Sequence, residues 1–455
     1  MNVLPRGRDL FVWLSLALAG ALSAHAADRP HIVYLLADDL GYKDLGFQGG
    51  KIPTPNIDKL ATTGVTLSSF YVQPFSSQTR AALLTGRYPM RYGLQTMSIV
   101  SASQFGLPTE ERTLAQALKE VGYHTAFIGK WQLGHAKPEF WPTKRGYDYF
   151  YGTLSGEANY QVKKSTKSDW RRNDQPLKED GVVTQLLAKD ALNVINKHSV
   201  ASPLFLLVAF TAPSADASTQ SGNGYAAGVS ALDDAVGQII GALEKKKMLN
   251  NTLIVFHSDN GGAVPTKFAT GDGDVTKFGA DNGIYREGKG SLYEGGVRVT
   301  ALAAWPEKIK EKTVVTRLLH VTDMYTTLLS VAGAKLDQPK KLDGFDVWKT
   351  LAEEQLSPRD EMLLNVEDFR GAIRVGEWKL IVRATLPNKL ELFDIANDPE
   401  ESQNQAEAYP DRVKSLLQRL NEYAYEMAAP KYLEEIGQAR GGGIPIYWGD
   451  NPPRR

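Results

Sequence analysis

Apolar residues along this chain form short runs that are separated by amphipathic segments. Four runs are apolar at consecutive positions, which is typical of strands buried on both faces of a parallel sheet. We predict strands at residues 32–37 and 126–128, and within "PLFLLVAFTA" and "NTLIVFHSDNGG".

The amphipathic segments between these strands carry helix boundary signals. In "TPNIDKLATTGV", Thr54 can cap a helix that ends at Gly64, and a second helix is expected from Thr113 to Gly122. A third is expected in "AAGVSALDDAVGQIIGALEKKKM". Strands that alternate with helices predict an α/β fold, in which a mostly parallel sheet is sandwiched by helices. In such sheets, ligands bind at the carboxyl ends of the strands.

The pattern changes after about residue 334. The stretch "LDQPKKLDGFD" suits a connection, "GAIRVGEWKLIVR" and "KLELFDI" predict the two strands of a hairpin, and "PDRVKSLLQRLNEYAYEMA" predicts an amphipathic helix. We therefore expect an α/β domain over residues 27–340 and a smaller α+β domain over 341–430. Residues 431–455 end in "GGGIPIYWGDNPPRR" and are expected to be irregular.

The first residues predict export. Arg6 and Arg8 precede an apolar run from Leu10 to Leu22, and Ala24-His25-Ala26 has the form of a cleavage site. This pattern indicates a signal peptide at residues 1–26 and a periplasmic or secreted protein without a membrane anchor, because the run is shorter than the ~20 residues of a membrane span.

Composition narrows the chemistry. Basic and acidic residues are equal in number at 52 each, so a nucleic-acid partner is not expected. The chain has no cysteine, which excludes disulfides, thiolate metal sites and cysteine nucleophiles.

Two groups of oxygen donors follow predicted strands. Asp38 and Asp39 end the first strand, and Asp259 and Asn260 end a later one. Neighbouring side chains on a strand point in opposite directions, so both carboxylates can face one ion only if the strand breaks there, which Gly41 permits. Hard oxygen ligands favour Ca²⁺ or Mg²⁺. Ordinary turn residues are the alternative explanation.

Anion-binding groups occur in three other segments. In "SSQTRAALLTGRYP", Ser76 or Ser77 lies where a helix begins, and Arg80 lies one turn further on. Lys130 and Lys289 stand among glycines, which suits the binding of a tetrahedral oxyanion. By pattern alone, the serine is explained as an N-cap and the lysines as solvated side chains.

The combination of motifs is more specific than any one of them. In order, "HIVYLLADDLGYKDLG", "SSQTRAALLTGRYPMRYGLQ", "GYHTAFIGKWQLG", "IVFHSDNGG", "GKGSLYEGGVRV" and "LELFDIANDPEE" closely resemble the sulfatase family of the alkaline phosphatase-like superfamily. The branch that the chain most resembles is the arylsulfatase B type, which removes 4-sulfate from N-acetylgalactosamine in glycosaminoglycans. The resemblance extends from about Arg29 to near Met427.

The resemblance implies an alkaline-phosphatase-like α/β domain, a small C-terminal domain, one Ca²⁺ and roles for particular residues. Ser76 would occupy the nucleophile position, and Arg80, Lys130 and Lys289 would hold the nucleophile and the sulfate. The metal ligands would be four oxygen donors: Asp38, Asp39, Asp259 and Asn260.

The chain departs from the family pattern at three positions. The family nucleophile is a formylglycine, made from the first residue of a Cys/Ser-x-Pro-x-Arg motif, but Gln78 replaces the proline and speaks against conversion of Ser76. Gln132 and Ser214 stand where the family has catalytic histidines. Neither side chain transfers protons near neutral pH, so we expect them to contact the substrate without acting as an acid or a base. His135 and His257 lie near these motifs in sequence. Packing at a strand end or on the surface is a better explanation for both histidines than a catalytic role.

We therefore expect an exported, calcium-dependent sulfatase-like hydrolase that acts on a sulfated carbohydrate, with Mg²⁺ as the other candidate ion. Two alternatives remain. An unmodified Ser76 can serve with the metal to cleave a glycosidic or phosphoester bond, or the protein can be a non-catalytic binder of anionic glycans.

Overall fold

The computed structural model describes residues 29–156, 161–163, 169–214, 224–264, 279–385 and 387–438. The expected signal peptide and the glycine- and proline-rich end of the chain lie outside these residues. Among the residues described, none of the helices combines the length and apolar character that a membrane span requires.

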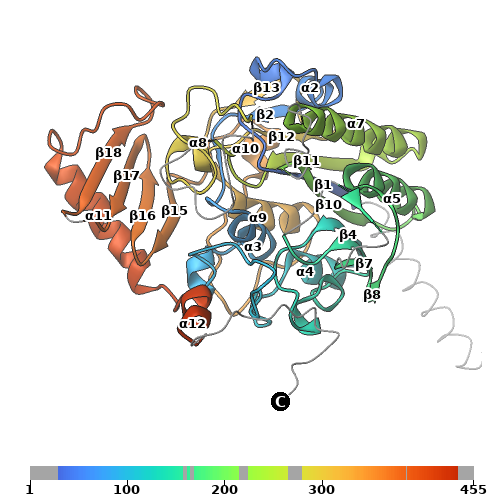
Figure 1. The fold of residues 1–455 in the computed structure, drawn as a ribbon. Helices are drawn as coiled ribbons and strands as arrows, with labels where there is room; N and C mark the ends of the chain where they lie inside the picture. Colours follow the sequence, from blue (N-terminus) through green and yellow to red (C-terminus); the bar gives the residue numbers. More distant parts are fainter. Residues whose placement is uncertain are drawn as a thin grey trace, which may run out of the picture.

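The larger unit is built on one ten-stranded sheet (Figure 1). Its strands lie in the following order: β13 (Thr313–Val315), β2 (Val65–Leu67), β12 (Ala301–Ala304), β11 (Thr252–Ser258), β1 (His31–Asp38), β10 (Leu204–Pro213), β4 (His124–Lys130), β5 (Tyr149–Thr153), β7 (Trp170–Arg172) and β8 (Gln175–Pro176). The five strands from β11 to β5 are parallel to one another, and antiparallel pairs flank them.

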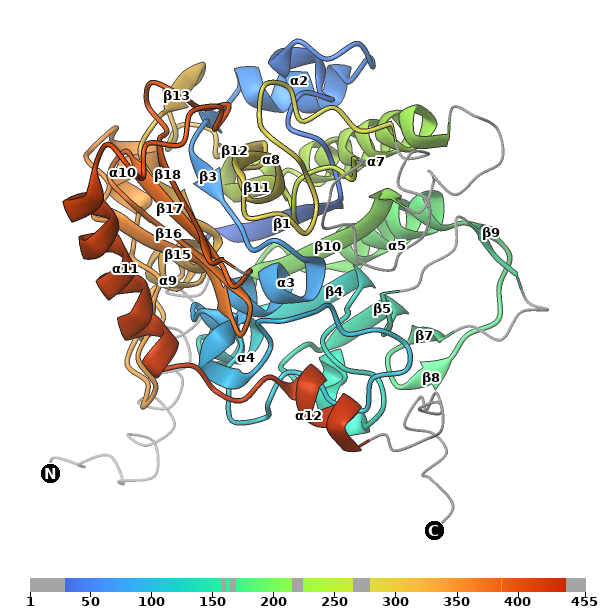
Figure 2. The same ribbon diagram turned by 60° about the vertical axis from the view of Figure 1, so that its left-hand side comes forward.

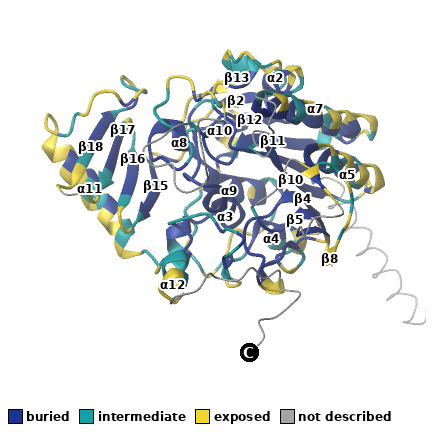
Figure 3. Cartoon of the chain, in the orientation of Figure 1, coloured by how far each residue is buried: buried dark blue, intermediate teal, exposed yellow. Residues whose placement is uncertain are grey.

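The central strands β1, β10 and β11 are buried at every position because both of their faces are covered. In β1, Tyr34 belongs to one hydrophobic core and its neighbour Leu35 to the other. Helices α3 (Ser76–Thr85), α4 (Leu114–Glu120) and α9 (Val321–Val331) contribute to the first core. Helices α2 (Pro55–Thr62), α5 (Val183–Lys197) and α7 (Gly224–Lys245) cover the opposite face. The predicted α/β sandwich is confirmed, and Figure 3 shows the sheet as the most deeply buried layer.

The C-terminal unit is a four-stranded antiparallel sheet beside the larger one (Figure 2). Its strands are β15 (Glu361–Glu367), β16 (Arg370–Val375), β17 (Trp378–Arg383) and β18 (Lys389–Asp394). Helix α11 (Pro410–Tyr425) buries Val413, Leu416 and Leu420 against one face. The small α10 (Trp348–Ala352), which precedes this sheet in sequence, contacts α9 of the larger unit.

Two expectations for the C-terminal part were wrong. The segment 371–383, predicted to be one strand of a hairpin, forms a hairpin by itself, because Gly376 adopts a left-handed conformation (φ 55°) between β16 and β17. Residues 431–438, expected to be irregular, form helix α12 (Lys431–Gln438), whose first backbone N–H donates to Gly93 O at 2.9 Å.

The helix boundaries follow the sequence signals in part. Thr113 caps α4 in a capping box with Gln116, as predicted. Thr54 precedes α2, but its hydroxyl accepts the Gly46 N–H at 2.8 Å and donates to Asp58 Oδ1 at 2.9 Å, so it caps no N–H of the helix. The remaining elements are short: β3 (Phe70–Tyr71), β6 (Gln161–Val162), β9 (Gly181–Val182), β14 (Leu319–His320), α8 (Glu294–Val297), η1 (Gly46–Gln48), η2 (Pro89–Tyr92), η3 (Pro138–Phe140), η4 (Pro142–Lys144) and η5 (Leu249–Asn251).

Candidate active site

Three buried carboxylates meet at the carboxyl ends of β1 and β11. These strands pair in parallel with Ala37 opposite Ser258, so the residues that follow them emerge side by side. Asp38, Asp39 and Asp259 each offer an oxygen within 4.8 Å of the others, and each is at most 3% exposed. The two groups of donors predicted from separate strands therefore form one cluster.

The backbone turns at Asp39 itself. Asp39 has φ 62°, a left-handed conformation that only a few per cent of non-glycine residues adopt, and it lets two consecutive carboxylates face the same point. The strand therefore breaks at Asp39, two residues before the Gly41 that was expected to permit the break. The Asp39 N–H donates to Asp259 Oδ1 at 3.1 Å, which ties the turn to β11.

Three cations neutralise this cluster. The Arg80 guanidinium lies 3.2 Å from Asp38 and 2.9 Å from Asp259. Lys130 lies 2.8 Å from Asp38, and Lys289 lies 2.8 Å from Asp39. The Lys289 side chain is 22% exposed whereas those of Arg80 and Lys130 are 3% and 5% exposed, so the site opens to solvent beside Lys289.

Burial opposes ionisation of both Asp38 and Asp259, but the neighbouring cations offset it to different degrees. Burial raises the pKa of Asp38 to about 7 against the opposing effect of Lys130. Burial also works against ionised Asp259, but Arg80 and Lys130 outweigh it and lower its pKa to about 2. Three like charges in so small a volume are stable only with close countercharge.

These donors fit a divalent cation. Three carboxylates and the amide oxygen of Asn260 are hard ligands of the kind that Ca²⁺ and Mg²⁺ prefer. Three carboxylates facing three cations carry no net charge, so a bound divalent ion would give the site two positive charges. Such a site is suited to an anionic substrate.

Ser76 lies at the edge of this cluster. It is the first residue of α3, it is 1% exposed, and its hydroxyl donates to Asn260 Oδ1 at 3.1 Å. The N-cap is Phe75, so the interpretation of Ser76 or Ser77 as an N-cap was wrong. Ser77 has a different function, because its hydroxyl donates to Gln132 O at 3.0 Å.

The two residues at the family histidine positions are also near this site. Ser214 follows β10 and donates to Asp39 Oδ2 at 2.6 Å. Gln132 adopts a left-handed conformation (φ 53°), and its Nε2 lies 3.4 Å from Ile99 O. Its buried Oε1 has no hydrogen-bond partner among the described residues. A buried acceptor without a partner is costly, so this amide is a candidate to bind a substrate hydroxyl or N–H group.

Three other candidates lie outside the cluster. Gln78 is fully buried and donates to Gln95 O, away from the carboxylates. His257 Nε2 contacts the Tyr34 hydroxyl at 2.7 Å, and burial lowers its pKa to about 4. His135 contacts Ser101 O at 2.9 Å. Both histidines therefore fill core positions.

The sequence reasoning missed the residues that hold the turn at Asp39. The Tyr225 hydroxyl, from α7, accepts the Gly41 N–H at 3.1 Å and donates to Asp44 Oδ2 at 2.6 Å. The Ser258 hydroxyl accepts the Leu40 N–H at 2.9 Å. Asp44 lies within the quoted motif "DDLGYKDLG". Tyr225 has no such signal in the sequence around it, because it reaches the site from a helix about 180 residues further along the chain.

Comparison with known proteins identifies the family. A family model described as "Sulfatase" matches residues 30–334, and one described as "N-sulphoglucosamine sulphohydrolase, C-terminal" matches residues 283–426. Arylsulfatase J of Mus musculus is 33% identical over 464 residues, which cover 87% of this chain and 76% of that protein. N-acetylgalactosamine-6-sulfatase of Mus musculus is 33% identical over 400 residues, covering 80% and 74%.

Solved structures agree with this assignment. The crystal structure of Ps i-CgsB in complex with k-i-k-neocarrahexaose has a TM-score of 0.78 at 32% identity and covers 88% of this chain and 94% of that chain. The PsFucS1 sulfatase from Pseudoalteromonas sp. has a TM-score of 0.72 at 26% identity, with coverages of 94% and 96%. The chain belongs to the sulfatase family and is a sulfatase-like hydrolase. The predicted family is confirmed, and the arylsulfatase B branch stays a prediction.

Proposed function

We propose that the protein is an exported hydrolase, dependent on Ca²⁺ or Mg²⁺, that acts on sulfate esters of a carbohydrate. The observation that carries this proposal is the contact of Ser76 with Asn260 beside a cluster of three carboxylates and three cations. The names of similar proteins, which include an N-acetylgalactosamine-6-sulfatase and a complex with neocarrahexaose, support a carbohydrate substrate.

Each residue has a defined role in this proposal. The divalent cation would be held by Asp38, Asp39, Asp259 and Asn260, and when bound it would withdraw negative charge from the sulfate. Lys130 and Lys289 would change partner from the carboxylates to the sulfate oxygens. Arg80 would hold Asp38 and Asp259 in place. Ser76 supplies the hydroxyl that attacks sulfur: a bond forms between Ser76 Oγ and sulfur, the bond between sulfur and the sugar oxygen breaks, and the hydroxyl proton passes through water to the released sugar oxygen.

The fate of the resulting sulfate ester depends on the chemical state of Ser76. If Ser76 is converted to formylglycine, its hydrate has a second hydroxyl, and loss of that proton expels sulfate and restores the aldehyde. An unmodified serine has no such group, so water must cleave the ester. Ser214 and Gln132 do not ionise near neutral pH and therefore cannot act as the acid or base of this step.

Two mass measurements test the mechanism. A Ser76 peptide about 2 Da lighter than the encoded sequence would identify the aldehyde, because its formation removes two hydrogens. If Ser76 is unmodified, incubation with an aryl sulfate should add about 80 Da, one sulfuryl group, to the same peptide. Neither change, together with no hydrolysis of aryl sulfates in Ca²⁺ or Mg²⁺, would refute sulfate ester cleavage.

A second candidate function is the binding of an anionic glycan without turnover. It is favoured by the contact between Ser214 and Asp39, because a neutral hydroxyl occupies the position from which the family histidine would transfer a proton. A sulfated oligosaccharide that raises the melting temperature of the protein but is recovered intact would support this function.

A further inference from the structure

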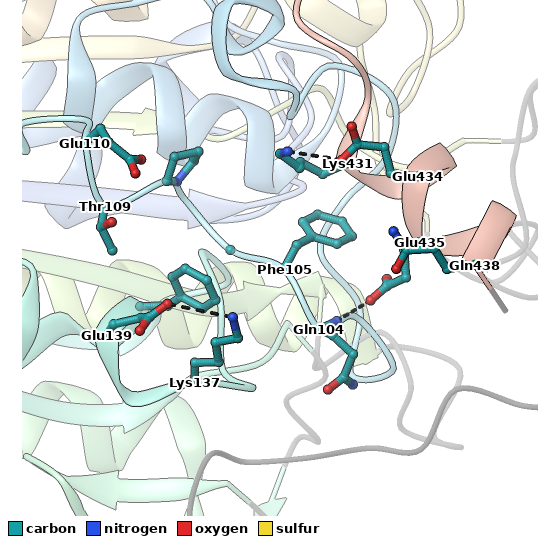
Figure 4. A pocket seen from close by; sticks show the side chains of 13 residues that line it. Gln104, Phe105, Thr109, Glu110, Lys137, Glu139, Lys431, Glu434, Glu435 and Gln438 are labelled. Atoms are coloured by element: carbon teal, nitrogen blue, oxygen red, sulfur yellow. Dashed lines mark hydrogen bonds and ion pairs between the residues drawn. The ribbon is translucent and has the colours of Figure 1, made fainter. Parts of the chain in front are cut away.

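A groove of about 410 Å³ lies outside the candidate active site, between α12 and the larger unit. Figure 4 shows Phe105 near its middle, with Lys431 and Glu434 of α12 on one side and with Glu110 on the other. The volume is within the usual range of small-molecule sites, roughly 300–1,000 Å³. The groove shares no lining residue with the carboxylate cluster.

The groove has an aromatic floor and a wall fixed to the rest of the protein. Phe140 is buried and Phe105 is half-buried, so the ring of Phe105 is the more accessible of the two. The wall formed by α12 is held in place because Glu435 Oε1 accepts the backbone N–H of Gln104 at 2.5 Å. The site therefore exists only when the C-terminal helix is docked.

Two chain segments connect this groove with the candidate active site. Ile99 accepts a hydrogen bond from Gln132 and donates its N–H to Ser77, next to the nucleophile position. Gln104 is five positions after Ile99, Lys137 is five positions after Gln132, and Gln104 and Lys137 both line the groove. Even fully extended, five residues span at most about 18 Å. A short oligosaccharide can therefore reach both places.

The charges of the groove disfavour a sulfated ligand. Lys431 lies 3.0 Å from Glu434 and Lys137 lies 3.9 Å from Glu139, so the lysines are already paired. The lining has two ammonium groups and four carboxylates, which leaves an excess of two negative charges: Lys137, Lys431, Glu110, Glu139, Glu434 and Glu435. Carboxylates accept hydrogen bonds from sugar hydroxyls but repel sulfate, and an aromatic ring can cover the apolar face of a sugar.

We propose that this groove is a distal subsite that binds an unsulfated sugar unit of a carbohydrate chain. The proposal rests on the proposed function, because the sulfated unit of the same chain would occupy the candidate active site. The protein would then prefer chains in which an unsulfated unit lies a few sugars from the sulfate.

Direct binding measurements test the subsite without requiring turnover. The probes are two uncharged hexasaccharides, of agarose and of a desulfated carrageenan backbone, titrated calorimetrically into the full-length protein. Phe105→Ala should weaken the binding of at least one probe about threefold to tenfold. Phe345→Ala is the matched control, because it removes a ring that is 44% exposed elsewhere on the surface and should leave binding unchanged. Equal affinity of wild type and Phe105→Ala, or no binding of either probe, would overturn the proposal.

A charge variant tests the exclusion of sulfate. Glu110→Lys reverses one carboxylate that has no ion pair among the described residues, and it should improve the binding of a sulfated carrageenan hexasaccharide about twofold to fivefold relative to the desulfated one. An unchanged preference would contradict the role of these charges.

If Phe105→Ala instead changes the oligomeric state in sedimentation, the groove is a protein interface and the subsite proposal is wrong. Hydrolysis of a small aryl sulfate, which does not extend to the groove, reports on the proposed function separately.

Discussion

Arg80 lies between two buried carboxylates, and replacing it by methionine isolates its effect on the site. Its guanidinium contacts Asp38 and Asp259 and donates to Lys130 O at 2.6 Å, while its side chain is only 3% exposed. Removing one partner of a buried ion pair typically costs about 3–5 kcal/mol, because the remaining charge is buried without compensation. We expect Arg80→Met to lower the free energy of unfolding by this amount in the presence of EDTA.

A divalent cation should reverse part of this loss. The variant cluster has one more uncompensated negative charge than the wild type, so Ca²⁺ should stabilise the variant more than the wild type. Urea unfolding, with and without Ca²⁺, measures both effects. Lys310→Met is the control: its side chain is 72% exposed and its partner Glu354 is 49% exposed, so the expected loss is below about 1 kcal/mol. Equal losses for the two variants, or a Ca²⁺ effect no larger in Arg80→Met than in wild type, would refute this reasoning.

Three further predictions concern the turn, the sulfate contact and acid stability. Tyr225→Phe removes the hydroxyl that contacts Gly41 and Asp44, and it should weaken Ca²⁺ binding about tenfold in a calorimetric titration; unchanged affinity would show that other contacts hold the turn at Asp39. Lys289→Ala should lower kcat/KM for an aryl sulfate about 10²–10³-fold with little change in melting temperature, since its side chain is 22% exposed; an equal loss of stability would indicate a structural role. Burial, and secondarily a neighbouring histidine, lower the pKa of His31 to about 4. Unfolding restores its ordinary value of about 6.5, so the unfolded chain binds the extra proton and stability falls as the pH decreases from about 6.5 to 4. His31→Gln should reduce this slope in urea unfolding at several pH values, and an unaltered slope would contradict the assignment.

The sequence predicted the central architecture because its signals are local. Residues 32–37 in β1 and 253–256 in β11 are apolar at consecutive positions, and such strands are stable only when both faces are covered. The carboxyl ends of parallel strands lie at one edge, so the proximity of Asp38 to Asp259 could be expected. The C-terminal sheet was predicted less well, because the short turn at Gly376 is hard to distinguish from a glycine within a strand.

The sequence alone determined the family, the oxygen donors and the departures from the family pattern at Gln78, Gln132 and Ser214, since these depend only on residue type and order. Only the tertiary structure decided what those residues contact. Ser214 lies against Asp39, Gln132 Oε1 is buried with no partner among the residues that the structure describes, and Gln78 donates to Gln95 O. The physical reason is that these contacts join elements far apart in sequence, whose separations are set by packing of the whole sheet and its helices.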